Sequence, residues 1–134
     1  MLLEIDHHSG VPIYRQIKDQ VREQIMAGRL REGDQLVSVR ELAAQLKVTP
    51  VTISKAYSAM EAEGLLERRR GIGLFIAKIH SSKKEQTKEA IIEAQLSRAV
   101  TTAIQFGLSH EKTGKMLKDL FLKYQKERGR DSNE

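Results

Sequence analysis

The chain has 134 residues, of which 31% are charged, and a net charge of +5 at pH 7. A chain of this length forms one domain, or a small domain with an extension, and its core is too small for a bulky enzyme. It has no cysteine, and no apolar run approaches the roughly 18 residues that a membrane span needs. We therefore expect a soluble, cytoplasmic protein that does not associate with a membrane.

The basic excess is spread along the whole chain. Residues 1–80 contain 12 basic and 10 acidic residues, and residues 81–134 contain 11 and 8. Neutralising phosphates with basic side chains favours nucleic-acid binding, but only where those side chains gather on one surface. A DNA-binding function must therefore be argued from individual basic residues.

Two amphipathic helices are predicted in the first half of the chain. After Pro12, apolar residues recur every four positions and the pattern stops near Gly28; they are Ile13, Ile17, Val21 and Ile25. Ser38 and Glu41 then stand at the spacing of a capping box. The apolar residues after Ser38 fall at i, i+3, i+4 and i+7, which predicts a short second helix.

A third helix begins at a proline. Thr49 suits the N-cap and Pro50 suits the first helical position, where a missing N–H group costs nothing. Only Lys47 and Val48 separate the second helix from this N-cap, so a tight turn joins the two helices, as in a helix-turn-helix. Gly64 is the expected C-terminal stop.

Two short strands are predicted after the third helix. Residues 65–69 and 74–79 read as strands on either side of a glycine-containing turn, and together they form a β-hairpin. Three helices followed by a hairpin predict a winged helix-turn-helix domain over residues 1–80. The expected fold class is mainly α with a small β wing.

The second half of the chain predicts two further helices after a polar segment, residues 80–88. This segment reads as a linker or a cap, because Ser82 and Glu85 again have capping-box spacing. Gly107 ends the first of the two helices, and Ser109 caps the second. The last residues, 129–134, are expected to form a disordered tail.

Each of these two helices has an apolar face. About fifty residues in two helices cannot easily bury two such faces alone, so self-association or packing on the first domain is expected. We expect residues 81–128 to be a dimerisation region that is also a possible effector region. Its predicted contact residues are Ile92, Leu96, Ala99, Ala103, Phe106, Leu117, Leu120, Phe121 and Tyr124.

The outer side of the third helix is a candidate DNA-binding surface. Burial of Ile53, Ala56, Tyr57 and Met60 would turn Val51, Lys55 and Ser58 outward. In helix-turn-helix proteins the start of this helix enters the major groove, where hydroxyl groups bond base edges or phosphates and small apolar groups touch thymine methyls. Alternatively, these residues only cap the helix and form its solvent-exposed side. The candidate contacts are Thr49, Pro50, Val51, Thr52, Ser54 and Lys55.

Two basic features flank this helix. Arg40, near the start of the second helix, is placed to reach a phosphate or a base at the groove rim, or else it forms a surface ion pair. At the hairpin tip, Arg69, Arg70 and Gly71 suit insertion into a narrow minor groove, although a charge run is more often a solvated strand.

Catalytic and metal sites are not indicated. No histidine shares a helical face with other potential ligands, and the two glycines at 71 and 73 are too close together for a phosphate loop. No serine stands beside a plausible base in a strained turn. We expect no cofactor, no metal and no enzymatic activity.

Residues 37–77, VSVRELAAQLKVTPVTISKAYSAMEAEGLLERRRGIGLFIA, resemble the DNA-binding domain of the GntR family of bacterial transcription regulators. The short two-helix tail is similar to the YtrA subfamily. The resemblance implies a homodimeric repressor that binds a palindromic operator in double-stranded DNA, often beside genes for ABC-type transporters. Separately, we expect an unidentified effector that favours another spacing of the two recognition helices to release the operator, and the alternative that no small molecule binds stays open. It places DNA contacts at Arg40, Thr49, Thr52, Ser54, Arg70 and Gly71.

The chain departs from the family pattern at four positions. Many members have an arginine that reads bases directly where Pro50 stands, so their base preference does not transfer to this chain. Val37 replaces a usual proline and Leu74 a usual threonine. Lys47 replaces a common glycine, and a left-handed conformation there would cost about 1–2 kcal/mol.

A winged-helix module that binds proteins without reading DNA sequence is the alternative function.

Overall fold

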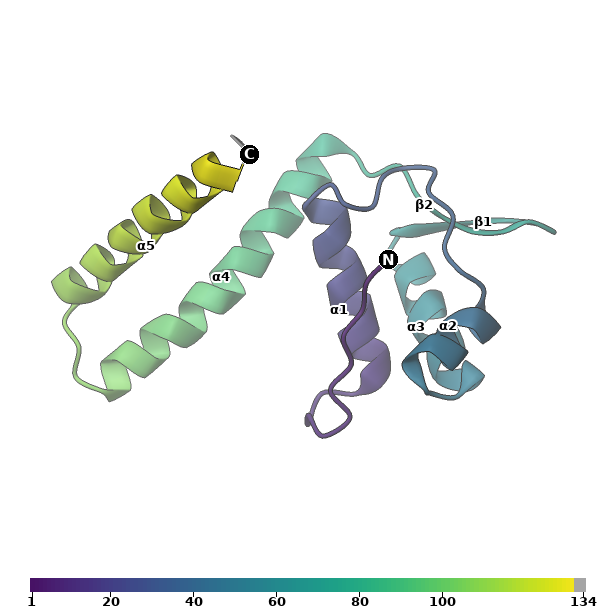
Figure 1. Ribbon diagram of the computed structural model, residues 1–134, viewed down its shortest axis with the longest axis horizontal. Helices are drawn as coiled ribbons and strands as arrows, with labels where there is room; N and C mark the ends of the chain where they lie inside the picture. Colours follow the sequence, from purple (N-terminus) through teal and green to yellow (C-terminus); the bar gives the residue numbers. More distant parts are fainter. Residues whose placement is uncertain (132–134) are drawn as a thin grey trace. The chain divides into compact units, whose positions relative to one another are not determined.

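The computed structural model describes residues 1–131, with side chains to residue 129 (Figure 1). The chain divides into two units, residues 1–88 and 89–134, and the boundary falls inside the fourth helix. The predicted mainly helical architecture with a small wing is confirmed. The elements are α1 (Ile13–Met26), α2 (Val39–Leu46), α3 (Pro50–Ala62), β1 (Leu66–Arg69), β2 (Gly73–Ile76), α4 (Ser81–Gln105) and α5 (His110–Asp131).

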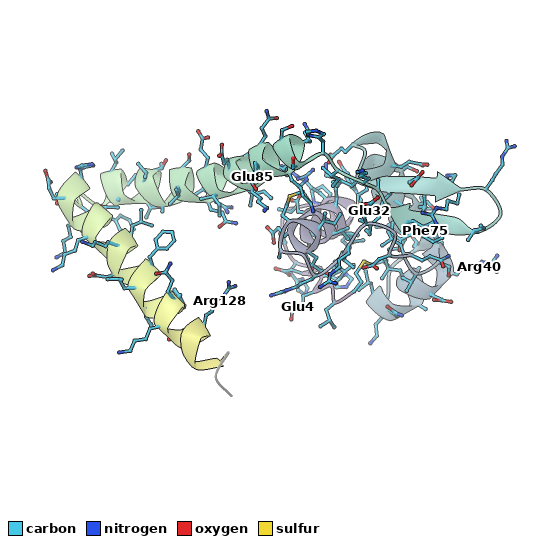
Figure 2. All side chains as sticks on the ribbon, turned by 90° about the horizontal axis from the view of Figure 1, so that it is seen from above. Glu4, Glu32, Arg40, Phe75, Glu85 and Arg128 are labelled. Carbon is cyan, nitrogen blue, oxygen red and sulfur yellow. The ribbon has the colours of Figure 1, made fainter. Side chains whose placement is uncertain are left out.

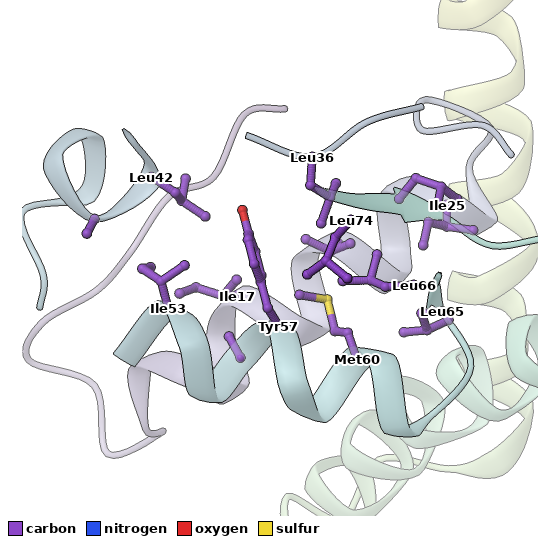
Figure 3. Close-up of a cluster of buried hydrophobic side chains, with 14 residues drawn as sticks. Ile17, Ile25, Leu36, Leu42, Ile53, Tyr57, Met60, Leu65, Leu66 and Leu74 are labelled. Carbon is purple, nitrogen blue, oxygen red and sulfur yellow. The ribbon is translucent and has the colours of Figure 1, made fainter. Parts of the chain in front are cut away.

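The core of the first unit forms where α1, α2 and the hairpin pack against α3. Figure 3 shows the ring of Tyr57 in the middle of the cluster, with Leu42 and Ile53 to one side and Met60 and Leu74 to the other. The inward face predicted for α3 is confirmed, because all four of its residues are buried. Each large apolar side chain removed from water in this way stabilises the domain by about 1.5–3 kcal/mol.

Tyr57 also makes a polar contact from within the core. Its hydroxyl group donates a hydrogen bond to the carbonyl oxygen of Val37 at 2.9 Å. Burial, helped by the negative charge of Glu41, raises the pKa of Tyr57 to about 12. The phenol therefore stays protonated and remains a donor at neutral pH.

The turn between α2 and α3 has the predicted geometry. Ser38 Oγ accepts a hydrogen bond from the N–H group of Glu41 at 3.2 Å, and Thr49 caps α3 with Pro50 as its first residue. Lys47 ends α2 in the left-handed conformation, with φ 56° and ψ 47°. A side chain there brings Cβ close to the backbone, so this lysine is strained.

The wing has a third pairing segment that the sequence did not reveal. β1 and β2 pair in antiparallel register from Leu66↔Ile76 to Arg69↔Gly73. On the other edge of β2, the N–H group of Leu36 bonds the carbonyl oxygen of Leu74 at 2.9 Å, and Gln35 bridges Phe75. The segment before α2 therefore covers the outer edge of the hairpin.

The second strand was predicted too long. It ends at Ile76, and residues 77–79 lie outside it. β1 begins only at Leu66, so Ile76 is the last residue with a strand partner, and Ala77 instead donates to the carbonyl oxygen of Leu65 at 2.9 Å.

A row of glutamines on α1 holds the extended N-terminal segment. The side chain of Gln20 makes two hydrogen bonds to the backbone of Glu4, at 2.9 and 2.6 Å. Gln16 bonds the backbone of Asp6 in the same way, at 2.9 and 3.0 Å, and Gln24 donates to the carbonyl oxygen of Leu2. These glutamines lie one turn apart, so they align with alternate residues of the segment.

The linker predicted for residues 80–88 is wrong, because α4 begins at Ser81. The expected Ser82–Glu85 cap is replaced by His80, whose Nδ1 accepts from the N–H group of Ser82 at 3.2 Å and whose carbonyl oxygen accepts from Lys84. The long polar side chains between residues 83 and 88 are good helix formers, and a cap one residue earlier lets them join the helix.

At the other end, Ser109 caps α5 as predicted, through a bond from the N–H group of Lys112 at 3.1 Å. Residues 129–131 were expected in a disordered tail and instead belong to α5, while residues 132–134 lie outside the described residues. Within residues 1–131, no helix has the length and apolar content needed to cross a membrane.

Glu63 joins α3 to α1 through two cations. Its carboxylate accepts from Lys18 Nζ at 2.8 Å and from the guanidinium of Arg22. Partial burial alone would raise the pKa of Glu63, but the hydrogen bonds and charges of Lys18 and Arg22 outweigh it and lower the pKa below its ordinary value of 4.5. The ion pairs therefore stabilise the domain only while this carboxylate is charged.

We predict that Lys47→Gly raises the free energy of unfolding by about 0.5–1 kcal/mol, because glycine adopts the left-handed conformation without strain. Urea unfolding followed by circular dichroism measures the change. Lys47→Ala is the matched control, since it keeps Cβ and the strain. Equal stabilities of the glycine and alanine variants would refute the explanation.

We predict that Glu63→Gln lowers the free energy of unfolding at pH 7 by up to about 1 kcal/mol, a modest value because the carboxylate is 36% exposed. The folded-state pKa is depressed, so the carboxylate's contribution is present above its unfolded pKa and is lost as pH falls through the folded pKa. Thermal melts from pH 7 to pH 3 should therefore show the wild type and the variant converge below pH 4.5. Glu67→Gln, an exposed change on β1, should show no such convergence.

Candidate nucleic-acid interface

The outer side of α3 carries the residues that the sequence placed there. Val51, Ser54, Lys55 and Ser58 are exposed, whereas Thr52 is half-buried. Val51 is the exposed large apolar residue of this helix, with 77% of its surface exposed. The outer side is therefore formed by small side chains, and it bears one basic residue.

Thr49 caps the helix, and its hydroxyl group also contacts that of Thr52. Thr49 Oγ1 accepts from the N–H group of Thr52 at 3.4 Å, and the two hydroxyl oxygens lie 3.1 Å apart. Only one hydroxyl hydrogen is needed for that contact, so the second remains available to an external acceptor. The capping alternative is thus present in the structure, and it leaves one donor at the start of α3.

Lys55 is drawn towards α1. Its Nζ lies 4.3 Å from the centre of the Tyr14 ring, a cation–π contact. The contact places this positive charge beside the ring of Tyr14, next to α3.

Arg40 is exposed in the first turn of α2, on the side of the domain towards which the β1–β2 hairpin extends (Figure 2). The surface ion pair left open by the sequence is not formed, because Arg40 has no hydrogen bond or ion pair within the described residues. A cation in the first turn of a helix also opposes the helix dipole. No polar contact within the described residues therefore engages the guanidinium of Arg40, which is available to a partner.

The arginines of the wing differ in their contacts. Arg68 pairs with Glu61 at 3.2 Å, and the guanidinium of Arg69 lies 4.1 Å from the centre of the Phe75 ring. Arg70 follows at the tip, where no interaction holds it within residues 1–131. Of the run of three arginines, Arg70 alone combines the tip position with an unengaged charge in the described part of the chain.

Backbone conformation shapes the tip of the wing. Gly71 has φ 75°, which disfavours other residues, and the N–H group of Ile72 bonds the carbonyl oxygen of Arg69 at 3.0 Å to close the turn. Gln35 also donates to the carbonyl oxygen of Ile72 at 3.0 Å. Sequence reasoning missed Ile72, whose side chain is 64% exposed beside Arg70 and Gly71.

The helices of the second unit leave their apolar faces uncovered. No residue of α4 is buried, and no side chain of α5 up to residue 129 is buried either. Of the predicted dimerisation residues, Ala103 alone is half-buried; the exposed ones are Ile92, Leu96, Ala99, Phe106, Leu117, Leu120, Phe121 and Tyr124. Val100, Ile104 and Met116 extend this apolar surface.

No metal site is assembled in the part of the chain that the structure describes, because no three histidine, aspartate or glutamate side chains come close enough to share an ion. The four histidines lie at positions 7, 8, 80 and 110, and the ring of His80 is used in capping α4.

Comparison with known proteins identifies the family. The family model described as bacterial regulatory proteins, gntR family, matches residues 13–76. The HTH-type transcriptional repressor YtrA of Bacillus subtilis (strain 168) is 36% identical over 119 residues, which are 89% of this chain and 92% of YtrA. The chain belongs to the gntR family. The predicted likeness to YtrA is confirmed as well.

Solved structures extend the match of this gntR-family chain to its fold. A GntR family transcriptional regulator from Listeria monocytogenes covers 86% of the chain, and 98% of its own length is matched, with a TM-score of 0.73 and 30% identity. AraR(DBD) in complex with operator ORX1 covers 57% of the chain and is matched over 99% of its length, with a TM-score of 0.51 and 28% identity. As a gntR-family member, the protein is a DNA-binding transcription regulator and not an enzyme, as predicted.

Proposed function

We propose that this gntR-family regulator is a homodimeric repressor that binds a two-fold symmetric operator in double-stranded DNA. The observation that carries the proposal is the availability of two arginines, Arg40 in the first turn of α2 and Arg70 at the tip of the wing, in a domain whose α3 begins with an exposed side. YtrA, its relative over most of both chains, is itself named a transcriptional repressor.

The proposed DNA contacts have distinct tasks. The start of α3 enters the major groove, and the wing tip, with Arg70 and Gly71, approaches the adjacent minor groove. Arg40 binds a phosphate or a base at the groove rim. Lys55 and Arg69 lie over aromatic rings, which leaves them to contribute positive charge to the interface as a whole. The hydroxyl groups and small side chains face base edges; they are Thr49, Pro50, Val51, Thr52 and Ser54.

Dimerisation would bury the apolar faces of α4 and α5. These faces hold large apolar residues that the chain itself leaves in water, and a second copy offers an identical surface. Two copies joined through α4 and α5 would present two recognition helices to half-sites about 34 Å apart, one turn of DNA. A dimer bound over a promoter would obstruct transcription.

Regulation and target complete the proposal. An effector that favours another separation of the two winged domains would release the operator, because a ligand shifts an equilibrium only between states that it binds unequally. The YtrA-like architecture makes genes for an ABC-type transporter the first targets to test. A repressor acts where the chromosome is, so we propose a cytoplasmic location.

The function is tested by selecting binding sites from a random-sequence DNA pool with the purified full chain. We predict a two-fold symmetric motif whose affinity falls steeply as salt rises, because bound phosphates release counterions. Binding to a protein partner that is insensitive to salt, with no sequence enriched from the pool, would favour the interaction-module alternative.

We predict that Arg40→Ala and Arg70→Ala each weaken binding to the selected operator by about ten- to hundredfold, since each removes a charged contact from both half-sites. Loss of a phosphate contact would also reduce the slope of log affinity against log salt by about 1 per contact. Fluorescence anisotropy at several salt concentrations measures both effects.

Arg29→Ala is the matched control for these variants, because it removes the same charge from an exposed site just after α1. It should leave operator affinity within about twofold. If Arg29→Ala weakened binding as much as Arg40→Ala, the arginines would act only through net charge. If Arg40→Ala or Arg70→Ala abolished the dimer, their assigned roles would be wrong.

We predict that Leu120→Glu converts the dimer to a monomer, because it places a charge in the apolar face of α5. Leu122→Glu is the matched control: Leu122 is similarly exposed, at 58% against 47% for Leu120, but it lies on another side of the helix. Analytical ultracentrifugation should give a monomer for the first variant and a dimer for the second. A dimer for both, or a monomer for both, would contradict the proposed interface.

A further inference from the structure

The outer side of α3 places an apolar side chain where the helix begins. Val51 is its second residue, and it precedes the buried Met60 by nine positions, or about two and a half turns. Val51 therefore points directly away from the core, and its 77% exposure shows that nothing in the first unit covers it. Single exposed valines are common, so the meaning of this one depends on its neighbours.

α3 carries no arginine, asparagine or glutamine that could form two hydrogen bonds with one purine. Its sequence, PVTISKAYSAMEA, has no arginine, asparagine or glutamine, the residues that bond guanine O6 and N7 or adenine N6 and N7 at two points. Lysine can also read guanine, but the charge of Lys55 lies 4.3 Å over the ring of Tyr14. The hydroxyl groups on α3 bond several bases with little discrimination. Val51 is the exposed large apolar residue that α3 presents, and an apolar side chain can distinguish a base by its methyl group.

The major groove presents one apolar feature, the C5-methyl group of thymine. Residues at the start of a recognition helix are those that meet base edges. We propose that Val51 is a specificity-determining residue that reads the methyl group of a thymine in each half-site of the operator. The inference rests on the proposed function, because it requires α3 to enter the major groove.

The test replaces thymine by deoxyuridine in the operator selected from the random pool. Deoxyuridine keeps every hydrogen-bonding group of thymine and lacks only the methyl group. The thymines are replaced one position at a time, symmetrically in both half-sites. At one position, the wild type should bind about fourfold more weakly per changed half-site, the effect of losing one buried methyl group.

Three variants link that position to Val51. Val51→Ala should weaken binding to the thymine operator and make binding indifferent to the replacement. Val51→Thr, which keeps a methyl group, should preserve the sensitivity. Ile72→Ala is the control: Ile72 is also exposed, but the wing faces the minor groove, which contains no thymine methyl, so this variant should respond to the replacement as the wild type does.

The outcomes separate this inference from the proposed function. A symmetric, salt-dependent operator whose thymines can all be replaced without loss, or whose half-sites have no thymine, would overturn the role of Val51 and leave the repressor proposal standing. Sensitivity that persists unchanged in Val51→Ala would assign the methyl contact to another residue. Failure to enrich any sequence would overturn the proposed function and, with it, this inference.

Discussion

The hydroxyl group of Tyr57 reaches from the middle of α3 to the carbonyl oxygen of Val37, just before α2 begins. The ring fills the centre of the core, and its hydroxyl group has a hydrogen-bond acceptor there, so burial leaves no donor unpaired. Val37 follows the segment that covers the edge of β2, and it precedes the Ser38 cap of α2. One side chain thus sets the position of α3 relative to the wing and to the turn that carries Arg40.

The two units of the chain differ in whether their apolar side chains are buried. In the first unit a cluster of aliphatic residues from the helices and the hairpin lies inside, and Glu63 adds ion pairs between α3 and α1 at the surface. In the second unit, α4 and α5 keep their apolar residues in water. Helices are stabilised mainly by packing of such faces, so the apolar residues of α4 and α5 add little stability while they remain in water.

Much of this fold could be predicted, because its signals are local. The periodicity of Ile17, Val21 and Ile25 identifies α1, and a threonine followed by a proline marks the start of α3. The short gap between α2 and α3 forces Lys47 into a left-handed turn. The inward and outward sides of α3 follow from the burial of four residues, which is why Val51, Lys55 and Ser58 could be predicted to be exposed.

The features that could not be predicted come from contacts between distant residues. The pairing of Leu36 with β2 involves too few residues to produce a strand pattern, and glutamines one turn apart on α1 look like an ordinary solvated face. The sequence alone also gives no way to tell which arginine of the wing is held by a neighbour. The start of α4 was missed because the capping pattern of Ser82 competed with that of His80.

The outer side of α3 makes few contacts with the rest of the domain. Val51, Ser54 and Ser58 are exposed and take no part in the core, so replacing them costs the fold little. Their neighbours Ile53 and Tyr57 on the same helix are fixed by packing. Substitutions on this outer side can therefore change what α3 contacts while they leave the stability of the domain almost unchanged.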